Sequence, residues 1–307
     1  MGKKDKASWN YFQDEARVAD MINTCCYGGA QIVKPEDVRS ADSLNSNGER
    51  DVIRKSALGN RYVFIGIENQ DTVDHSLPVR IMGYDYGDYK RQVDKIKRKN
   101  KRKRKKEADA ANADDISGEI LYDYKKTDKI SPVVTIVLYY GDDWDGPKSV
   151  LEMTDADKGL EASGLLQDYR INLINVSKLS DEELDKFRTD IKQVFKFIKN
   201  RKDREKMACI INNDPYYKNV EKTAHEMMKV YGGLRGYNIK EKDYRSNEGG
   251  MDMCKAWDDQ REEGRAEGIK EERKNTERER LRAEKAEAEK KILLEEIAKL
   301  RMLAEAK

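Results

Sequence analysis

Residues 50–70 read RDVIRKSALGNRYVFIGIENQ, and this stretch decides the fold. Two runs that suit β-strands, 51–55 and 61–67, flank a turn centred on Gly59. Strand-forming runs joined by a short glycine-containing turn are typical of a β-hairpin. The second run leads straight into the polar residues ENQ at 68–70, so the predicted strand carries polar side chains to the open end of the hairpin.

Asp51 begins the first predicted strand and Glu68 ends the second, so the two acids fall nearly opposite each other. Opposed residues on antiparallel strands lie about 5 Å apart. Gln70, two residues beyond Glu68, lies on the same face of the pleat. Two carboxylates and an amide suit a hard cation such as Mg²⁺, which lowers the pKa of bound water and stabilises charge on a phosphodiester. The alternative is two acids that are simply solvated at a strand end, and the spacing alone leaves both interpretations open.

The rest of the chain alternates between helical and extended patterns. The run 132–141 is apolar throughout and predicts a central strand, whereas 168–176 predicts a peripheral one. Ser180 and Glu183 form a capping-box pattern that opens an amphipathic helix. Further helices are expected over 9–25, from Pro78 onward, and over much of 203–245. This order predicts an α/β fold in which helices flank a mixed central sheet.

Charge is distributed unevenly along the chain. The net charge is only +2, but residues 90–106 contain twelve basic side chains among seventeen. Such a run predicts non-specific, salt-dependent contact with DNA phosphates, and we expect Lys97, Arg98, Lys101 and Arg102 to make it. The alternative is a solvated insert whose charge is neutralised by the acidic residues that follow.

The segment 251–307 is nearly all charged residues and alanine, which predicts a charged helical tail. Its only apolar seam consists of Ile292, Leu293, Ile297 and Leu300. The seam is shorter than two heptads, so a solvated helix is favoured over a coiled coil. A homo-oligomer formed through this helix is the alternative.

Composition argues against several classes of protein. Charged residues make up 39% of the chain and apolar ones 37%, and no apolar run approaches the length of a membrane span. The first ten residues lack the apolar core of a signal peptide. Four cysteines, two of them adjacent, and two histidines fit neither a zinc site nor a disulfide framework. We therefore expect a cytoplasmic protein with reduced thiols and no membrane partner.

Six segments occur in an order that resembles one family of bacterial proteins. They are VADMIN (18–23), QIVKPEDV (31–38), RDVIRK (50–55), IGIENQ (65–70), LPVRIMGYDY (77–86) and VVTIVLYYGDDWDGP (133–147). Together they resemble the recombination-promoting nucleases, also described as transposases, of the PD-(D/E)xK superfamily. The tail segment EEGRAEGIKEE (262–272) is similar to the tails of many members. The resemblance implies a restriction-endonuclease-like αβββαβ core and metal-dependent DNA cleavage linked to recombination or mobile elements.

The resemblance also implies roles for individual residues. Asp51 matches the motif aspartate, Glu68 matches the second acid, and Gln70 takes the place of the superfamily lysine. Asp20 matches an acidic position on the first core helix. Asp51, Glu68 and Gln70 are thus the expected catalytic residues, and Asp51, Glu68 and Asp20 the expected ligands of Mg²⁺ or Mn²⁺. Two positions depart from the pattern: Arg50 replaces the usual proline, and Gln70 can orient a water molecule but adds no charge.

On this basis the chain divides into three parts. Residues 1–200 are expected to form the nuclease-like domain, with a basic, low-complexity insert at about 95–130. A helical extension at 201–250 and the charged helical tail at 251–307 follow. The alternative function is that of a weak or inactive nuclease-fold protein that binds nucleic acid or supports assembly.

Overall fold

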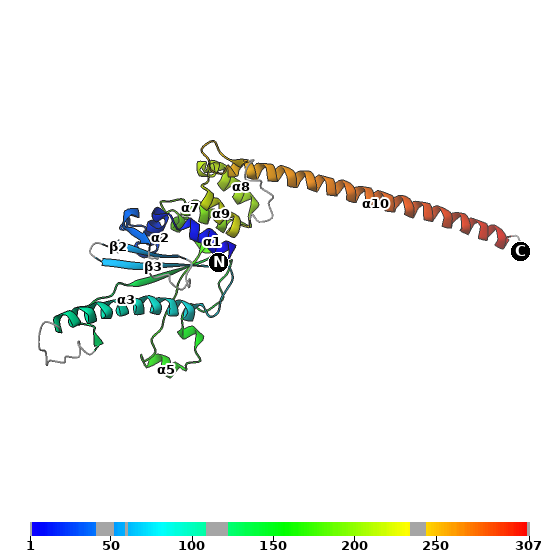
Figure 1. Cartoon of the computed structure of the whole chain (residues 1–307). Coiled ribbons are helices and arrows are strands. Elements are labelled where there is room, and N and C mark those ends of the chain that lie inside the picture. The colour runs from blue at the N-terminus through cyan, green and yellow to red at the C-terminus, as the bar shows by residue number, and fades with distance from the viewer. Residues whose placement is uncertain (1, 41–51, 59–60, 109–121, 234–243, 306–307) are drawn as a thin grey trace.

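The computed structural model describes residues 2–40, 52–58, 61–108, 122–233 and 244–305. A β-sheet lies between two layers of helices, and one long helix projects from this body (Figure 1). The predicted α/β architecture of a mixed sheet flanked by helices, with a long C-terminal helix, is confirmed.

Five strands form one sheet in the order β1-β2-β3-β4-β5. They are β1 (Val38–Ser40), β2 (Val52–Leu58), β3 (Arg61–Gln70), β4 (Val133–Tyr139) and β5 (Asn172–Asn175). The β1–β2 and β2–β3 pairs are antiparallel, whereas β3–β4 and β4–β5 are parallel. The predicted hairpin is therefore β2–β3, with β4 inside the sheet and β5 at its edge, as the sequence indicated.

Strand β3 is longer than its sequence predicts. The expected strand ends at residue 67, but β3 continues to Gln70. The last three residues pair with β4, where Glu68 lies opposite Val137 and Gln70 opposite Tyr139. Because β4 supplies backbone partners, the polar end of β3 stays in the sheet and does not leave it as a loop.

The helices account for most of the remaining described residues. They are α1 (Lys3–Tyr11), α2 (Glu15–Tyr27), α3 (Leu77–Ala108), α5 (Lys158–Ala162), α6 (Asp181–Leu184), α7 (Ile191–Lys199), α8 (Arg204–Asn213), α9 (Lys222–Tyr231) and α10 (Met253–Glu305). Short 3-10 turns are η1 (Pro35–Asp37), η2 (Leu151–Met153), η3 (Val176–Lys178) and η4 (Pro215–Lys218).

The main hydrophobic core lies on one face of the sheet. Ile65 and Ile67 of β3 contribute to it together with side chains of α1, α2, α7 and α9. Met207 of α8 and Met228 of α9 belong to the same core. Helices α8 and α9, from the part of the expected helical segment that the structure describes, therefore pack into the core of the body.

Helix α3 covers the opposite face, and its interface with the sheet is smaller and more polar. Leu77 and Ile81 pack against Val137 at the start of the helix. One turn further along, the buried carboxylate of Asp85 accepts a hydrogen bond of 2.6 Å from the Thr135 hydroxyl. The sheet face that α3 covers therefore accommodates buried polar side chains.

The helix predicted over 9–25 is interrupted near its middle. The Asp14 side chain accepts hydrogen bonds from the backbone of Ala16, at 2.7 Å, and of Arg17, at 3.4 Å. It is therefore the N-cap of a new helix, α2. The apolar periodicity runs on through this cap, which is why the pattern alone suggested a single helix.

The helix predicted from Ser180 onward is also divided. The capping box is confirmed, since Ser180 N donates to Glu183 Oε2 at 2.7 Å and Glu183 N donates to Ser180 Oγ at 3.1 Å. The first helix, α6, ends at Leu184, and α7 begins only at Ile191. Between them, backbone N–H groups bind a distant carboxylate, described below, in place of helical carbonyls.

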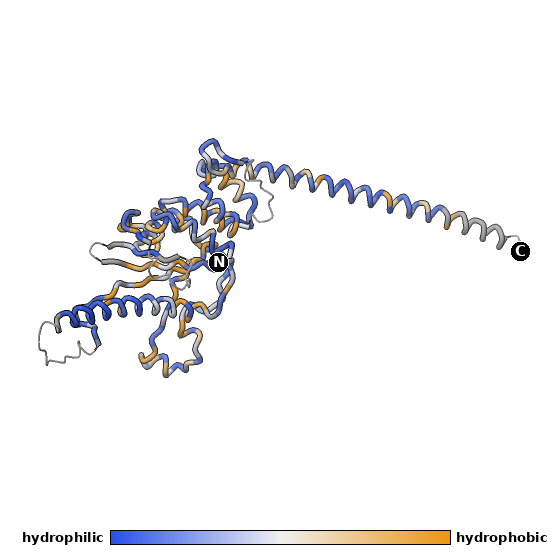
Figure 2. The backbone as a smooth tube through the Cα atoms, in the orientation of Figure 1, coloured by the Kyte–Doolittle hydropathy of each residue, from blue (hydrophilic) through white to orange (hydrophobic). Residues whose placement is uncertain are grey.

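Two long helices, α3 and α10, are largely hydrophilic (Figure 2). Helix α3 extends through the basic run to Ala108, so the first part of the expected insert is regular helix. Helix α10 contains 53 residues, and all of 264–291 is exposed to solvent. In the part of the chain that the structure describes, no helix is both long and apolar enough to span a membrane.

Candidate active site at the end of strand β3

Glu68 and Gln70 lie side by side on the face of β3 that α3 covers. Gln70 Nε2 is 3.4 Å from Glu68 Oε1, which confirms the expectation that the two side chains share a face. Glu68 is buried, with 7% of the residue exposed. A carboxylate in this position is shielded from bulk water, so its interactions with a nearby charge are stronger than at the surface.

Asp51 lies outside the described residues. The last described pair at this end of the hairpin is Val52 opposite Ile67, the residue before Glu68. The convergence of Asp51 with Glu68 therefore stays a prediction.

Arg80, on the first turns of α3, is a site residue that sequence reasoning missed. Its Nη2 atom donates to Glu68 Oε1 at 3.1 Å, and its Nη1 atom donates to Asp74 Oδ2 at 2.7 Å. The available signal was a cation in the first turns of a helix that directly follows an acid-bearing strand. Only the packing of α3 on the sheet, however, brings Arg80 onto the side chain of Glu68.

Asp74 holds Arg80 from the other side. The Asp74 carboxylate also accepts hydrogen bonds from the backbone N and the hydroxyl of Ser76, at 2.8 and 2.7 Å. Burial raises the pKa of Asp74, but the hydrogen bonds from Ser76 and the charge of Arg80 outweigh it and leave the pKa below its ordinary value. Asp74 therefore remains ionised and keeps the guanidinium oriented.

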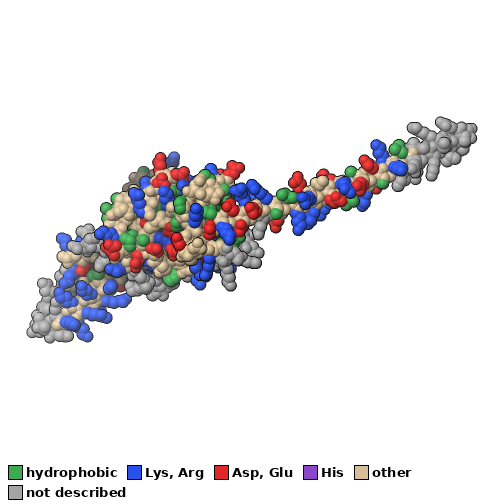
Figure 3. Space-filling view, turned by 90° about the horizontal axis from the view of Figure 1, so that it is seen from above, with side chains coloured by type: hydrophobic (Ala, Val, Ile, Leu, Met, Phe, Trp, Pro, Cys, Tyr) green, Lys and Arg blue, Asp and Glu red, His purple; other side chains and the backbone are tan. Residues whose placement is uncertain are grey.

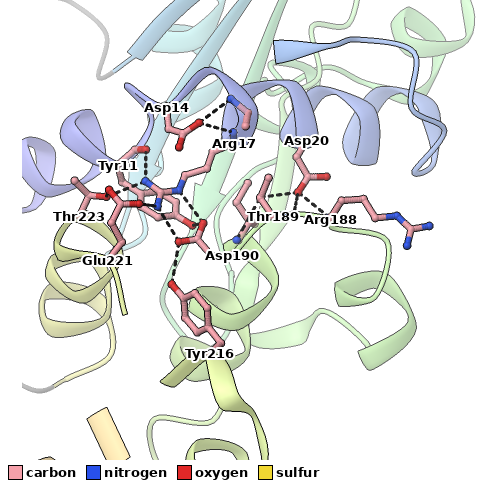
Figure 4. A network of polar contacts seen from close by, with 12 residues as sticks. Tyr11, Asp14, Arg17, Asp20, Arg188, Thr189, Asp190, Tyr216, Glu221 and Thr223 are labelled. Atoms are coloured by element: carbon pink, nitrogen blue, oxygen red, sulfur yellow. Dashed lines mark hydrogen bonds and ion pairs between the residues drawn. The ribbon is translucent and has the colours of Figure 1, made fainter. Parts of the chain in front are cut away.

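Asp20, the third expected metal ligand, is used elsewhere (Figure 4). Its Oδ2 atom accepts hydrogen bonds from Arg188 N at 2.8 Å, Thr189 N at 2.7 Å and Thr189 Oγ1 at 2.6 Å. Helix α2 packs on the sheet face that carries Ile67, whereas Glu68 projects from the other face. The structure does not bring Asp20 to the face of Glu68, and it gives this carboxylate the role of anchoring the segment before α7.

The described residues at the end of β3 offer one carboxylate and one amide as oxygen donors. Glu68 and Gln70 offer oxygen atoms, and Mg²⁺ is usually bound by one or two carboxylates while keeping several waters. Among the described residues, no three His, Cys, Asp or Glu side chains group closely enough to hold a metal ion. The described residues thus supply one carboxylate and one amide, and Asp51 is the residue expected to add the second carboxylate.

The basic residues of α3 separate into two faces. Lys95, Arg98, Lys99, Arg102, Lys103 and Lys106 line one hollow on the protein surface. Their spacing of three or four residues defines a single stripe along the helix, which we call the basic stripe. Of the four residues expected to contact DNA, Arg98 and Arg102 belong to the basic stripe, whereas Lys97 and Lys101 do not. Figure 3 shows the concentration of Lys and Arg side chains at this end of the molecule.

A different face of the same helix is already occupied. Asn100 Nδ2 donates to Asp128 Oδ2 at 2.7 Å, and Arg104 Nη1 lies 3.1 Å from Asp123 Oδ1. The acidic residues after the basic run therefore engage one side of α3. The basic stripe lies on another side, where its residues are exposed to solvent.

Comparisons of the chain with protein-family models, curated proteins and solved structures found no match. The functional assignment therefore depends on the residues at the end of β3 and along α3.

Proposed function

We propose that this chain is a metal-dependent endonuclease that hydrolyses phosphodiester bonds in DNA. The observation that carries the proposal is the pairing of Glu68 with Gln70 on one face of β3, beside the Arg80 guanidinium. A carboxylate, an amide and a cation at one strand end are suited to holding a divalent ion, a water molecule and a phosphate.

The order of elements supports a restriction-endonuclease-like core. Helix α2, strands β1 to β3, helix α3 and strand β4 follow one another in the order αβββαβ that the sequence resemblance implies. Of the proposed catalytic residues, Glu68 and Gln70 lie at the end of β3 beside α3. We include Asp51 with Glu68 and Gln70, and omit Asp20 because its carboxylate anchors the segment before α7.

Asp51 and Glu68 are the residues that would hold Mg²⁺ or Mn²⁺. When bound there, the ion would lower the pKa of a water molecule and stabilise the charge that develops on the phosphate. Gln70 orients the attacking water through its side-chain amide, and the buried position of Glu68 limits access of bulk water. The water oxygen adds to phosphorus, one P–O ester bond breaks, and the proton from water goes to the leaving oxygen.

The basic stripe of α3 supports DNA as the substrate. Its six cations lie on one helix face, where they can contact successive phosphates of a duplex. These contacts position the nucleic acid and carry no sequence information by themselves. The basic stripe therefore gives the proposed enzyme affinity for DNA but little preference for sequence.

A plasmid-nicking assay tests the proposal. Wild-type protein, Asp51→Asn and Glu68→Gln are compared with Mg²⁺ and with EDTA. We expect each substitution to lower the cleavage rate by about 100-fold or more, since each removes a group that acts directly at the reacting phosphate. Glu182→Gln, which changes an exposed acid on α6, is the matched control and should cleave as the wild type does. Equal cleavage by all four proteins would refute the proposal.

A second candidate function is nucleic-acid binding without cleavage. It is favoured by the ion pair between Arg80 and Glu68, because this pair competes with a metal ion for the same carboxylate oxygen. The same assay separates the two functions. Retained DNA binding with no cleavage by any of the four proteins would establish the binding protein.

A further inference from the structure

The ion pairs at the end of β3 bear on how a phosphate could bind there. The Arg80 guanidinium pairs with two carboxylates, those of Glu68 and Asp74. A phosphodiester brings another negative charge, so it can bind beside Glu68 only if a cation faces it.

Arg80 has the geometry to be that cation. Asp74 fixes its Nη1 atom at 2.7 Å, while the Nη2 atom is directed at Glu68. The Arg80 side chain is 35% exposed, whereas that of Glu68 is 9% exposed. A ligand that approaches from solvent therefore reaches Arg80 more readily than Glu68. The planar guanidinium also matches the oxygens of a phosphate, with which it forms paired hydrogen bonds.

We infer that Arg80 is the phosphate-binding residue of this site and that it exchanges partners when nucleic acid binds. Without nucleic acid, Nη2 holds Glu68 Oε1, as the structure shows. With a phosphodiester bound, Nη2 donates to a non-bridging phosphate oxygen and releases Oε1 to the divalent cation. Asp74 accepts the hydrogen bond from Nη1 in both states and so holds the guanidinium in place while Nη2 changes its partner. This inference rests on the proposed nuclease function.

The exchange couples the two ligands of the site. A phosphate that draws Arg80 away makes Glu68 a better metal ligand, and a metal ion on Glu68 releases Arg80 for phosphate. By linkage, each ligand must then strengthen the binding of the other by the same factor. The ion pair thus keeps the site closed to a metal until DNA is present.

The test measures metal binding and cleavage in the full-length protein. Mn²⁺ alone is titrated by calorimetry into wild type, Arg80→Gln, Arg80→Lys and Lys90→Gln, and plasmid nicking is measured for the same four proteins. Lys90 forms an exposed pair with Asp94 on the same helix, so Lys90→Gln is the matched control. Thermal unfolding of each protein verifies that it is folded.

The exchange predicts opposite effects of one substitution. Arg80→Gln should bind Mn²⁺ roughly tenfold more tightly than wild type, because Glu68 is released, within the roughly 5- to 150-fold range usual for coupled sites. The same variant should cleave about 100-fold more slowly, because it lacks the phosphate contact. Arg80→Lys keeps the charge but not the planar fork that contacts Asp74 and Glu68 together, so its Mn²⁺ affinity and its cleavage rate should both lie between those of wild type and Arg80→Gln.

Mn²⁺ binding by Arg80→Gln that is unchanged or weaker would overturn the inference, because Arg80 would then only position Glu68. Unchanged cleavage by Arg80→Gln would overturn it as well. If the wild type does not cleave at all, the proposed function fails, but the Mn²⁺ affinities still decide whether Arg80 closes the site.

Discussion

Arg17 of α2 and Asp190, the N-cap of α7, form a bidentate ion pair although 173 positions separate them in the chain. The Arg17 Nε–Asp190 Oδ1 distance is 2.7 Å and the Nη2–Oδ2 distance is 2.8 Å. The hydroxyl groups of Tyr11 and Tyr216 donate to the same carboxylate at 3.0 and 2.9 Å (Figure 4). Arg17 also pairs with Glu221, at the N-cap of α9. One buried arginine therefore joins the N-terminal helices to the helices that follow β5.

Replacing Arg17 by methionine should destabilise the protein by about 3–5 kcal/mol, because the Asp190 carboxylate would lose its cation in a largely buried site. The free energy of unfolding in urea is the measurement. The control is Lys192→Met, at a residue of α7, the helix that Asp190 caps. This substitution breaks a surface pair with Asp185 and should change stability by less than about 1 kcal/mol. A loss below 1 kcal/mol for Arg17→Met would show that the pair does not hold the two groups of helices together.

Stability should fall at high pH because of the tyrosines around Asp190. Burial, and after it the charge of Asp190, raises the pKa of Tyr11 and Tyr216 above the ordinary value of 10.0. The unfolded chain releases these protons near pH 10, whereas the folded protein retains them. The stabilisation is therefore fully present below pH 10 and is lost as the pH rises above 10, by about 1.4 kcal/mol per pH unit for each tyrosine.

Tyr216→Phe isolates this contribution. Because phenylalanine cannot ionise, the variant should lose stability above pH 10 less steeply than wild type, by about 1.4 kcal/mol per pH unit. Urea unfolding at several values between pH 9 and pH 11 provides the two slopes. Parallel slopes would mean that the Tyr216 pKa is the same in the folded and unfolded chains.

Asp20→Ala distinguishes an anchoring role from metal binding. The substitution leaves three donors on Arg188 and Thr189 without their acceptor, so we expect a loss of about 3 kcal/mol in stability. Cleavage per folded molecule should not change. Asp14→Ala, which removes the N-cap of the same helix, is the control and should cost about 1 kcal/mol. Loss of cleavage in folded Asp20→Ala protein would return Asp20 to the metal site.

Local chemistry was enough to predict the elements whose partners are close in sequence. The β2–β3 hairpin, the buried strand β4 and the Ser180 capping box depend on turn residues, apolar runs and a cap within a few positions. The division between α6 and α7 depends on Asp20, which lies 169 positions before Thr189. No pattern around residue 189 shows that a distant carboxylate will take its backbone N–H group.

The site shows the same limit. The shared face of Glu68 and Gln70 follows from the two-residue period of a strand, so the sequence was sufficient to predict it. The contact of Arg80 with Glu68 depends on where α3 packs along β3 and β4, which is set by buried residues such as Ile81 and Asp85. Sequence reasoning predicted the helix but had no means of placing Arg80 against the strand.

The two faces of α3 should differ in their effect on DNA binding. Replacing Lys95, Arg98 and Arg102 with glutamine removes three cations of the basic stripe, and replacing Lys97, Lys101 and Lys105 removes three outside it. The first triple variant should reduce the slope of log affinity against log salt by about 2.7, since each phosphate contact contributes about 0.9. The second should reduce it by less than about 1.

Fluorescence anisotropy with a 20-base-pair duplex between 50 and 200 mM salt measures both slopes, in a Glu68→Gln background that prevents cleavage. The two triple variants have the same net charge, so overall charge cannot account for a difference between them. Equal losses would show that DNA binding follows total charge and not the geometry of the stripe.

Truncation of α10 should distinguish its first turn, which packs against the body, from the exposed remainder of the helix. Met253 and Ala256 are buried, and the Cys254 thiol donates to Ile211 O at 3.3 Å, so the first turn belongs to the core of the body. Beyond it, 264–291 is exposed throughout. A chain that ends at residue 258 keeps this turn, so its free energy of unfolding should stay within about 1 kcal/mol of that of the full chain. A chain that ends at residue 250 should lose several kcal/mol, because buried methionine side chains each contribute about 2 kcal/mol or more. Urea unfolding compares the two. Sedimentation of the 1–258 chain beside the full chain also tests whether the tail is an oligomerisation helix. If the tail is a solvated helix, the mass in solution should fall only by the mass of the residues removed.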